Sequence, residues 1–402
     1  MTVLALRPHP AADRLLPVAD GRIARVDIIE DIAAAEPYWR ALEQGKCLAT
    51  AYQRYDFLKL WQRHIGTPAG ITPFISVGFN AKGTPLFLWP FGRRKLAGLR
   101  VVEFLGGKHT NFNMGLWRRD VVAGIEAHAL RGALGHLAGR ADMLKLTNQP
   151  LTWGGTTNPF SLLPQHRAAN FGFSGALIPD YEALLHMHTN SATRKKMRKK
   201  ERALASYGKV RFDQARGPHE IRRVLDVFFE QKSARMQVLG VRDAFAHPSV
   251  RRFIEAAATE QIPGGEPLIE LYTLSVGDIV VATYGGMVSG GRFCAMFNSI
   301  VKGHYAAESP GEQLLAMLVQ HSCARGLDTF DLAIGQANYK ALFCEDAEPL
   351  FDSYLPFDAG GRLLAFAFGT IAAAKRAVKQ HATLWSLVRA LRRLRARLVA
   401  AI

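Results

Sequence analysis

The order of hydrophobic and polar positions in the second half of the chain predicts a regular series of helices and strands. The alternation over residues 208–215 predicts a short strand. Apolar side chains at helical spacing then predict a helix over residues 219–239, which Gly240 ends. A second helix is expected over residues 248–261, because Pro248 favours the first helical turn.

Three strands follow these helices. Residues 267–276, 278–289 and 292–300 are rich in β-branched and aromatic side chains. Turn residues separate the three segments, with Gly290-Gly291 between the last two. We therefore predict an antiparallel meander.

A helix and a strand come after the meander. Ser309 is the predicted N-cap of the helix, Pro310 fits its first turn, and Glu312 completes a capping box. A strand is expected over residues 328–334, and further strands from Pro349 onward.

The first half repeats this order of helices and strands without visible sequence identity. A helix, three strand segments, a second helix and a further strand are expected at residues 52–65, 71–79, 85–94, 100–107, 126–138 and 142–148. We therefore predict a duplicated α/β (α+β) fold in which each unit is a mixed sheet with flanking helices. The first unit covers residues 1–175, the second covers residues 176–360, and a helical tail covers residues 361–402.

The predicted tail is basic and amphipathic. After Asp358 there is no acidic residue, and nine lysines or arginines follow. Apolar side chains recur on one face of the expected helix, at Leu384, Leu387, Val388, Leu391, Leu394 and Leu398. Such a helix can bind an anionic membrane surface or dock onto the protein itself, and the sequence leaves both alternatives open.

The whole chain is strongly basic, since 51 lysines and arginines against 34 acidic residues give a net charge of +17. This balance predicts attraction to a polyanion: a phosphorylated cofactor, an acidic carrier protein, tRNA or an anionic bilayer. Seven of the nine residues at 194–202 are basic. A helix there would turn Met197 and Leu204 inward, and its basic face would be either solvated or a contact for the polyanion. DNA is not expected as the partner, because no groove-binding motif accompanies this run.

The sequence also indicates where the protein works. The N-terminus has no apolar core of signal-peptide length, and residues 363–374, the longest uncharged apolar run, fall short of the roughly 20 residues that cross a bilayer. Four cysteines are scattered without a paired motif, which fits reduced thiols in a cytosol. We expect a cytoplasmic protein, with peripheral binding at the inner face of the membrane as an option.

Familiar catalytic motifs are missing from the sequence. It has no G-x-x-x-x-G-K-S/T loop, no H-E-x-x-H and no zinc-type cysteine spacing, so we predict no metal. The informative stretch is residues 304–354. A helix that begins at Pro310 and Gly311, directly after a central strand, offers free backbone N–H groups to an anion. Alternatively, Ser309 and Glu312 only cap this helix.

Four segments, taken in order, resemble the CelD-type acetyltransferase domain associated with cellulose biosynthesis: "SATRKKMRKKERALASYG", "SPGEQLL", "RGLDTFDLAIG" and "NYKALF". The order of elements resembles the GNAT acyltransferase fold, and the resemblance spans residues 185–355. It implies a tandem GNAT-like protein that moves an acyl group from a thioester, usually acyl-CoA, to an amine or hydroxyl of a small molecule or sugar. An acyl carrier protein is the alternative donor, because the general GNAT pattern R/Q-x-x-G-x-G/A is missing here.

The resemblance also implies which residues bind the donor. They are Ser309, Pro310, Gly311, Gly335, Lys340, Arg194, Lys195 and Arg198. The first three stand where the fold binds a pyrophosphate, and the next two belong, with Tyr339, to the family element G-x-x-x-Y-K. The last three would attract the polyanionic part of the donor.

The reaction needs few further groups, because a thioester is already activated. Asp331 and Glu308 are candidate bases, and Tyr339 or Tyr305 can protonate the leaving thiolate. Structural alternatives exist, with Asp331 as the partner of a loop, Tyr339 as a packed residue and Lys340 as a surface ion-pair partner.

Three functions remain open. The first is N- or O-acyl transfer in cell-surface polysaccharide or lipid-linked metabolism. The second is a Fem-type transfer from aminoacyl-tRNA, which resembles the same tandem plan, although the long helical hairpin of several Fem proteins has no counterpart here. The third is a scaffold without catalysis that acts at a membrane surface. The glycine-rich loop at residues 106–115 either lines an acceptor pocket between the units or only connects two elements.

Overall fold

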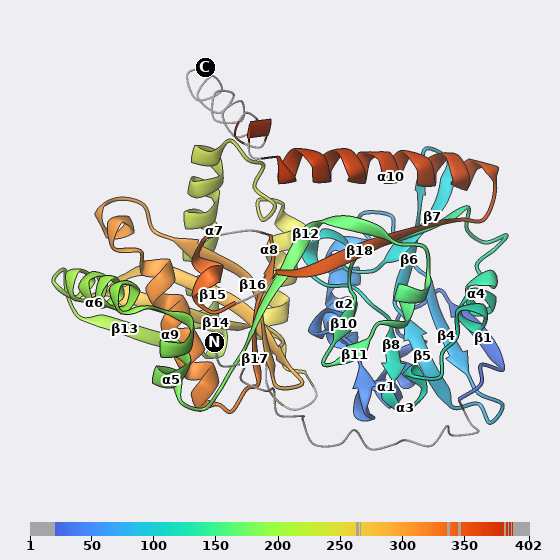
Figure 1. The fold of residues 1–402 in the computed structure, drawn as a ribbon, viewed down its shortest axis with the longest axis horizontal. Coiled ribbons are helices and arrows are strands. Elements are labelled where there is room, and N and C mark those ends of the chain that lie inside the picture. Colours follow the sequence, from blue (N-terminus) through green and yellow to red (C-terminus); the bar gives the residue numbers. More distant parts are fainter. Residues whose placement is uncertain are drawn as a thin grey trace, which may run out of the picture.

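The computed structural model describes residues 21–381, apart from 263, 264, 266, 336, 337, 345 and 346, together with residues 383, 384, 386 and 388. The described chain forms two α/β halves that lie side by side and are joined by one large sheet (Figure 1). The predicted mixed α/β fold class is thereby confirmed.

The second half follows the predicted order. It contains α5 (Tyr181–His188), α6 (Ser191–Ala205), β13 (Val210–Gln214), α7 (Gly217–Leu239), α8 (Pro248–Thr259), β14 (Glu270–Val276), β15 (Ile279–Ser289), β16 (Arg292–Ile300), α9 (Pro310–Ala324), β17 (Thr329–Ile334) and β18 (Ala347–Pro356). Strands β14, β15 and β16 pair antiparallel in sequence, which confirms the predicted meander. The prediction of several strands after Pro349 is wrong. The single strand β18 is followed by the helix α10 (Ala359–Gln380), because the Asp358 carboxylate accepts a hydrogen bond from Gly361 N (2.7 Å) and caps a helix there.

The first half has a similar order of elements with several additional short ones. It contains β1 (Arg25–Ile29), α1 (Glu36–Gln44), β2 (Cys47–Leu48), α2 (Tyr55–Trp61), β3 (Thr72–Pro73), β4 (Ile75–Phe79), β5 (Pro85–Trp89), β6 (Phe91–Leu96), β7 (Leu99–Phe104), β8 (Leu116–Arg118), α3 (Arg119–Val122), α4 (Ala127–Gly135) and β9 (Met143–Pro150). Two predicted strands are interrupted, one at Phe74 and one at Pro90, which has no N–H for a ladder. As a result β3 and β6 join the large sheet, whereas β4 and β5 join a second sheet in the order β1-β4-β5-β8-β2.

The two halves exchange their last strands. Strand β12 (His166–Ala176) ends the first half in sequence but pairs antiparallel with β17 and β18. Strand β18 in turn pairs antiparallel with β9 of the first half. The large sheet therefore has the order β13-β14-β15-β16-β17-β12-β18-β9-β7-β6-β3. The boundary expected at residue 175 lies at the end of β12.

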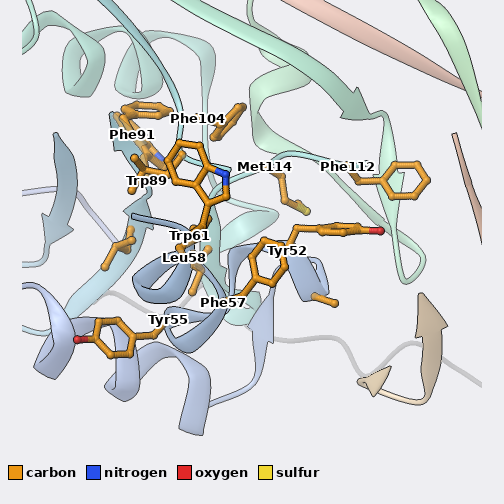
Figure 2. Packing of buried hydrophobic residues seen from close by; sticks show 14 of the residues in the cluster. Tyr52, Tyr55, Phe57, Leu58, Trp61, Trp89, Phe91, Phe104, Phe112 and Met114 are labelled. Atoms are coloured by element: carbon orange, nitrogen blue, oxygen red, sulfur yellow. The ribbon is translucent and has the colours of Figure 1, made fainter. Parts of the chain in front are cut away.

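A hydrophobic core extends from the first half into the second. Side chains alternate along β14 and β16, so that Leu271 and Cys294 face the core shared with the first half, whereas Tyr272 and Phe293 face the core beneath α9. Figure 2 shows the aromatic side chains of the first half that fill the shared core, Phe57 among them. The Phe57 ring packs edge-to-face on Phe253 of α8, with ring centroids 5.2 Å apart. The two halves therefore bury apolar surface against each other.

The described part of the tail docks onto the protein. Helix α10 packs on β18, β12 and β9 (Figure 1), and Arg376 and Lys379 donate hydrogen bonds to residues of β12. Leu363 and Phe366 remain 74% and 75% exposed on this helix. Four positions of the predicted apolar face lie outside the described residues, namely Leu387, Leu391, Leu394 and Leu398. No helix in the described part of the chain is long and apolar enough to cross a membrane.

Candidate functional site

The parallel strands β16 and β17 separate before they end. Their pairing begins at Arg292 with Thr329 and ends at Cys294 with Asp331. A cavity of about 280 Å³ lies between the separated ends, and we name it the splay cavity. It is lined by Asn111, Lys232, Tyr284, Ala295, Met296, Phe297, Asn298, Leu332, Ala333, Ile334, Gly335, Tyr339 and Lys340.

The end of β17 is held in an unusual backbone conformation. Ala333 has a φ of 63°, which is left-handed and costs energy for a residue with a Cβ. The Asp331 carboxylate accepts a hydrogen bond from Ala333 N (2.7 Å). The Lys340 ammonium donates to Ala333 O (3.0 Å) and Ile334 O (3.1 Å). These contacts direct the chain away from β16 and keep the gap open.

The facing edge of β16 receives side chains from two other segments. Asn111 Nδ2, in the loop after β7, donates to Ala295 O (3.3 Å) and to the Tyr52 hydroxyl (2.6 Å). Lys232 Nζ, on α7, donates to Asn298 O (3.0 Å). The loop at residues 106–115 therefore lines a pocket where the two halves meet, one of the two alternatives for this loop.

Burial shifts the pKa values of the ionisable groups around the splay cavity. Desolvation raises the pKa of Asp331 to about 6, although the Arg292 guanidinium 3.4 Å away lowers it. Burial lowers the pKa of Lys232 and of Lys340 to about 8 each. Burial also raises the pKa of Tyr339, so its phenol remains protonated at neutral pH. The site thus combines a carboxylate that is ionised above pH 6 with a protonated phenol.

The start of α9 differs from the predicted capping box. Ser309 precedes the helix and Pro310 is its first residue, but Ser309 is left-handed (φ 52°) and its side chain makes no cap hydrogen bond. A capping side chain needs an extended backbone at this position, which explains why the prediction is wrong. The Ser309 hydroxyl instead accepts a hydrogen bond from Lys200, and Lys200 Nζ lies 3.8 Å from Glu312 Oε2.

Helix α6 carries the basic run at residues 194–202 and lies beside the start of α9. Leu204 is fully buried and Met197 is half-buried, as the sequence predicts, and Lys200 lies on the same side as these two residues. Arg194 donates to the carbonyl of Thr189 at the end of α5. Lys195 and Arg198 are exposed. Lys200 is therefore the basic residue that meets the start of α9, and the sequence had not singled it out.

The remaining predicted residues lie in two places. Gly335, Tyr339 and Lys340 line the splay cavity, and Asp331 lies where the two strands part. Tyr305 and Glu308 lie in the 3₁₀ turn (His304–Glu308) before α9. The Tyr305 ring packs against Tyr207, with centroids 5.3 Å apart, and Glu308 O accepts a hydrogen bond from Gln313. Neither residue is part of the cavity lining.

Sequence reasoning missed four residues of the site: Asn111, Lys232, Tyr284 and Tyr52. They come from four segments that only the fold brings together, and no motif marks them. The polar, glycine-rich composition around Asn111 was the one usable signal. Among the described residues no group of histidine, cysteine and carboxylate side chains could hold a metal ion.

Comparison with known proteins identifies the class of the second half. Residues 191–341 match the family model described as "Acetyltransferase (GNAT) domain". This stretch begins with α6 and extends through β17 to Tyr339 and Lys340. The match supports an assignment of this stretch to the GNAT superfamily. No curated protein sequence matches the chain significantly.

Two solved structures share the overall fold. FemX has 10% identity and a TM-score of 0.52, with 86% of this chain and 100% of that chain covered. A conserved protein of unknown function from Bacteroides thetaiotaomicron has 10% identity and a TM-score of 0.51, with 82% and 100% covered. At this identity the likeness concerns the fold, and it extends over both halves. The prediction of a tandem GNAT-like fold is confirmed.

Proposed function

We propose that the protein is an acyltransferase that takes its acyl group from a thioester and works in the splay cavity. The observation that carries this proposal is the early separation of β16 and β17. It leaves one edge of β16 without a strand partner, among the described residues, beside a cavity of about 280 Å³. The start of α9 follows directly in sequence, and all three elements lie within the stretch that matches the GNAT domain.

Acyl-CoA is the donor that we propose. The Gly311 N–H and the helix dipole at the start of α9 favour the pyrophosphate, and Lys200 lies beside them. The exposed lysines and arginines of α6 would attract the remaining phosphate charge. The splay cavity would then hold the thioester end, which supplies an activated acyl group. An acyl carrier protein offers the same thioester and is the alternative donor.

Two residues are proposed for the proton transfers. The Asp331 carboxylate is buried where β16 and β17 part, directly behind Ala333 of the cavity lining, and its pKa of about 6 suits a base at neutral pH. The Tyr339 phenol lines the cavity and remains protonated, so it can donate a proton to the leaving thiolate. The acceptor would be an amine or hydroxyl of a small molecule or sugar, in cell-surface polysaccharide metabolism.

Thermal unfolding with acetyl-CoA and with a long-chain acyl-CoA tests the donor. A ligand present at 100 times its Kd should stabilise the protein by about 2.7 kcal/mol. Gly311→Ala should abolish this shift, because a Cβ at position 311 would lie 2.7 Å from Ile300 Cδ1 and displace the start of α9. Gly132→Ala is the matched control, since its Cβ would meet no atom within 4 Å. Absence of a shift with either thioester would contradict the proposal.

A Fem-type transfer from aminoacyl-tRNA is the second candidate. The fold shared with FemX permits it, and the exposed basic face of α6 would suit RNA as well as CoA. Binding of bulk tRNA that weakens steeply with salt, without any thioester effect, would favour this candidate. If neither donor binds, the scaffold hypothesis takes precedence.

Peripheral membrane binding is a further part of the proposal. Leu363 and Phe366 on α10 are exposed apolar side chains that could enter the interface of an anionic bilayer at the inner face of the membrane. Sedimentation with phosphatidylglycerol vesicles tests this. The paired variant Leu363→Ser and Phe366→Ser should remain in the supernatant, whereas unchanged sedimentation would contradict the proposal.

A further inference from the structure

A second cavity lies between the two halves, and we name it the inter-half cleft. Its volume is about 560 Å³. The first half contributes Arg54, Arg119 and Trp153 to its lining, and the second half contributes Gly290 and Arg292. None of these residues was predicted from the sequence as a site residue, and none lines the splay cavity.

Two tight hairpin turns form opposite walls of the cleft. One joins β10 (Thr152–Trp153) to β11 (Thr156–Thr157) through Gly154 and Gly155, with φ values of 53° and 73°. The other joins β15 to β16 through Gly290 and Gly291, with φ values of 56° and 76°. Two successive left-handed residues favour the compact two-residue hairpin, so both walls are well defined. Each half supplies one wall.

The cleft presents two arginines that form no ion pair within the described chain, although the Glu43 carboxylate, which also lines the cleft, attracts the Arg54 charge. Arg54 forms no ion pair there, and Arg119 Nη1 donates to the Thr156 hydroxyl (3.0 Å). Of the two lining carboxylates, Glu43 already accepts hydrogen bonds from Arg40 (3.2 Å) and Tyr55 N (2.7 Å). The other, Asp328, is exposed to solvent.

Asp331 is buried between the cleft and the splay cavity and lines neither of them. Arg292 lines the cleft, stacks 4.0 Å from the Trp153 ring centroid and places Nη1 3.4 Å from Asp331 Oδ2. The other carboxylate oxygen accepts from Ala333 N, and Ala333 lines the splay cavity. The buried carboxylate therefore contacts one residue from each cavity.

The segment after β2 also separates the two cavities. Ala51 and Gln53 line the cleft, whereas the hydroxyl of Tyr52, between them in sequence, donates to Ala295 O (3.4 Å) at the edge of the splay cavity. A molecule in the cleft would therefore be separated by the buried Tyr52 from a thioester in the splay cavity.

From these contacts we infer that the inter-half cleft binds a small molecule with a carboxylate or phosphate group. Arg54 and Arg119 hold the anionic group, since a guanidinium forms paired hydrogen bonds with either oxyanion. This inference does not depend on the proposed acyl transfer.

The test is calorimetric titration of the full-length protein with inorganic phosphate and, separately, with acetate. Both are measured with saturating coenzyme A present, which occupies the start of α9. We expect at least one anion to bind, and Arg54→Gln and Arg119→Gln to weaken its binding tenfold or more. Arg131→Gln, an exposed arginine of α4 with the same loss of charge, should bind like the unmodified protein.

The outcomes separate this inference from the proposed function. Equal anion binding by Arg54→Gln, Arg119→Gln and Arg131→Gln, or no binding at all, overturns the cleft assignment while coenzyme A binding keeps the donor site intact. Failure of coenzyme A to bind, with anion binding that still depends on Arg54 and Arg119, overturns the proposed donor but preserves the cleft. Unchanged unfolding midpoints of the two variants show that folding is not the cause.

Discussion

The two halves repeat one fold but differ at the gap that opens where two parallel strands of each half separate. In the first half the parallel pairing of β7 with β9 ends at Glu103 with Lys145, and in the second half that of β16 with β17 ends at Cys294 with Asp331. Each half has a left-handed residue shortly afterwards, Asn148 (φ 55°) in β9 and Ala333 (φ 63°) in β17.

The first half closes its gap with its own loop. Asn113 donates from its backbone N to Asn148 O (3.0 Å) and from Nδ2 to Thr147 O (3.0 Å). The neighbouring Phe112 and Met114 are buried in the shared core, where Figure 2 labels both. In the second half the chain after β16 continues to α9, and the splay cavity remains. The first half has thus filled this gap with its own loop, whereas the second half retains a cavity there.

The largest difference is expected between Asp331 and Lys145, at which the parallel pairing of β17 and of β9 ends. Asp331→Asn should lower the rate of acyl transfer about 10²–10⁴-fold if Asp331 is the base. The first-half counterpart, Lys145→Met, should leave the rate unchanged. Steady-state release of thiol measures both, and equal rates for Asp331→Asn and the unmodified protein would refute the assignment of the base.

Removing a buried ring from the closed gap should destabilise the protein strongly. Phe112 is 1% exposed, so Phe112→Ala should lower the free energy of unfolding by about 3–5 kcal/mol. Met296→Ala in the wall of the splay cavity should cost less than about 1 kcal/mol, because its side chain already borders empty space. Denaturant unfolding compares them, and equal losses would show that both gaps are packed alike.

The pH dependence of stability should report the buried carboxylate. The pKa of Asp331 is about 6 in the folded protein and 3.8 for an ordinary aspartate, so the folded state binds this proton more tightly. The stability linked to this group is complete below pH 4 and is lost as the pH rises through 6. The difference amounts to about 3 kcal/mol. Urea unfolding at pH 4 and pH 7 should show this loss in the unmodified protein and in Arg131→Gln but not in Asp331→Asn.

A smaller loss is expected when the hydrogen bonds of the closed gap are removed. Asn113→Ala leaves the carbonyl of Thr147 without its side-chain donor in a buried position, which should cost about 2 kcal/mol. Asn298→Ala at the splay cavity should cost less than half of this. If Asn298→Ala proves the more damaging variant in denaturant unfolding, the distinction between a closed and an open gap is wrong.

The smallest effect concerns the surface charge of α6. Lys195→Gln together with Lys199→Gln should weaken acyl-CoA binding only about two- to fivefold at low salt, because exposed charges are screened by solvent. The effect should disappear near 1 M salt. Arg131→Gln in the first half should have no effect on titrations with acyl-CoA, and a persistent loss at high salt would instead indicate direct contacts.

The hydrophobic periodicity was sufficient to predict most helices and strands, because it depends on residues that are neighbours in sequence. The helix ended by Gly240 and the meander from β14 to β16 are examples, since a helical stripe and paired glycine turns are local signals. The break at Pro90 and the left-handed Ser309 were not predicted. The break at Pro90 is a local signal that the prediction overlooked, since proline has no N–H for a ladder, whereas the conformation of Ser309 depends on how this turn meets other parts of the fold.

The sequence by itself determined the GNAT-like plan, the basic helix α6 before it and the stretch from Pro310 to Lys340 that borders the splay cavity. The tertiary structure decided the exchange of β12 and β18, the contact of Lys200 with Ser309, and the contribution of Asn111 and Lys232 to the cavity. It also decided which gap is open. The reason is physical: strand order, side-chain packing and burial arise from segments far apart in sequence, and they set both the cavities and the pKa values of the groups around them.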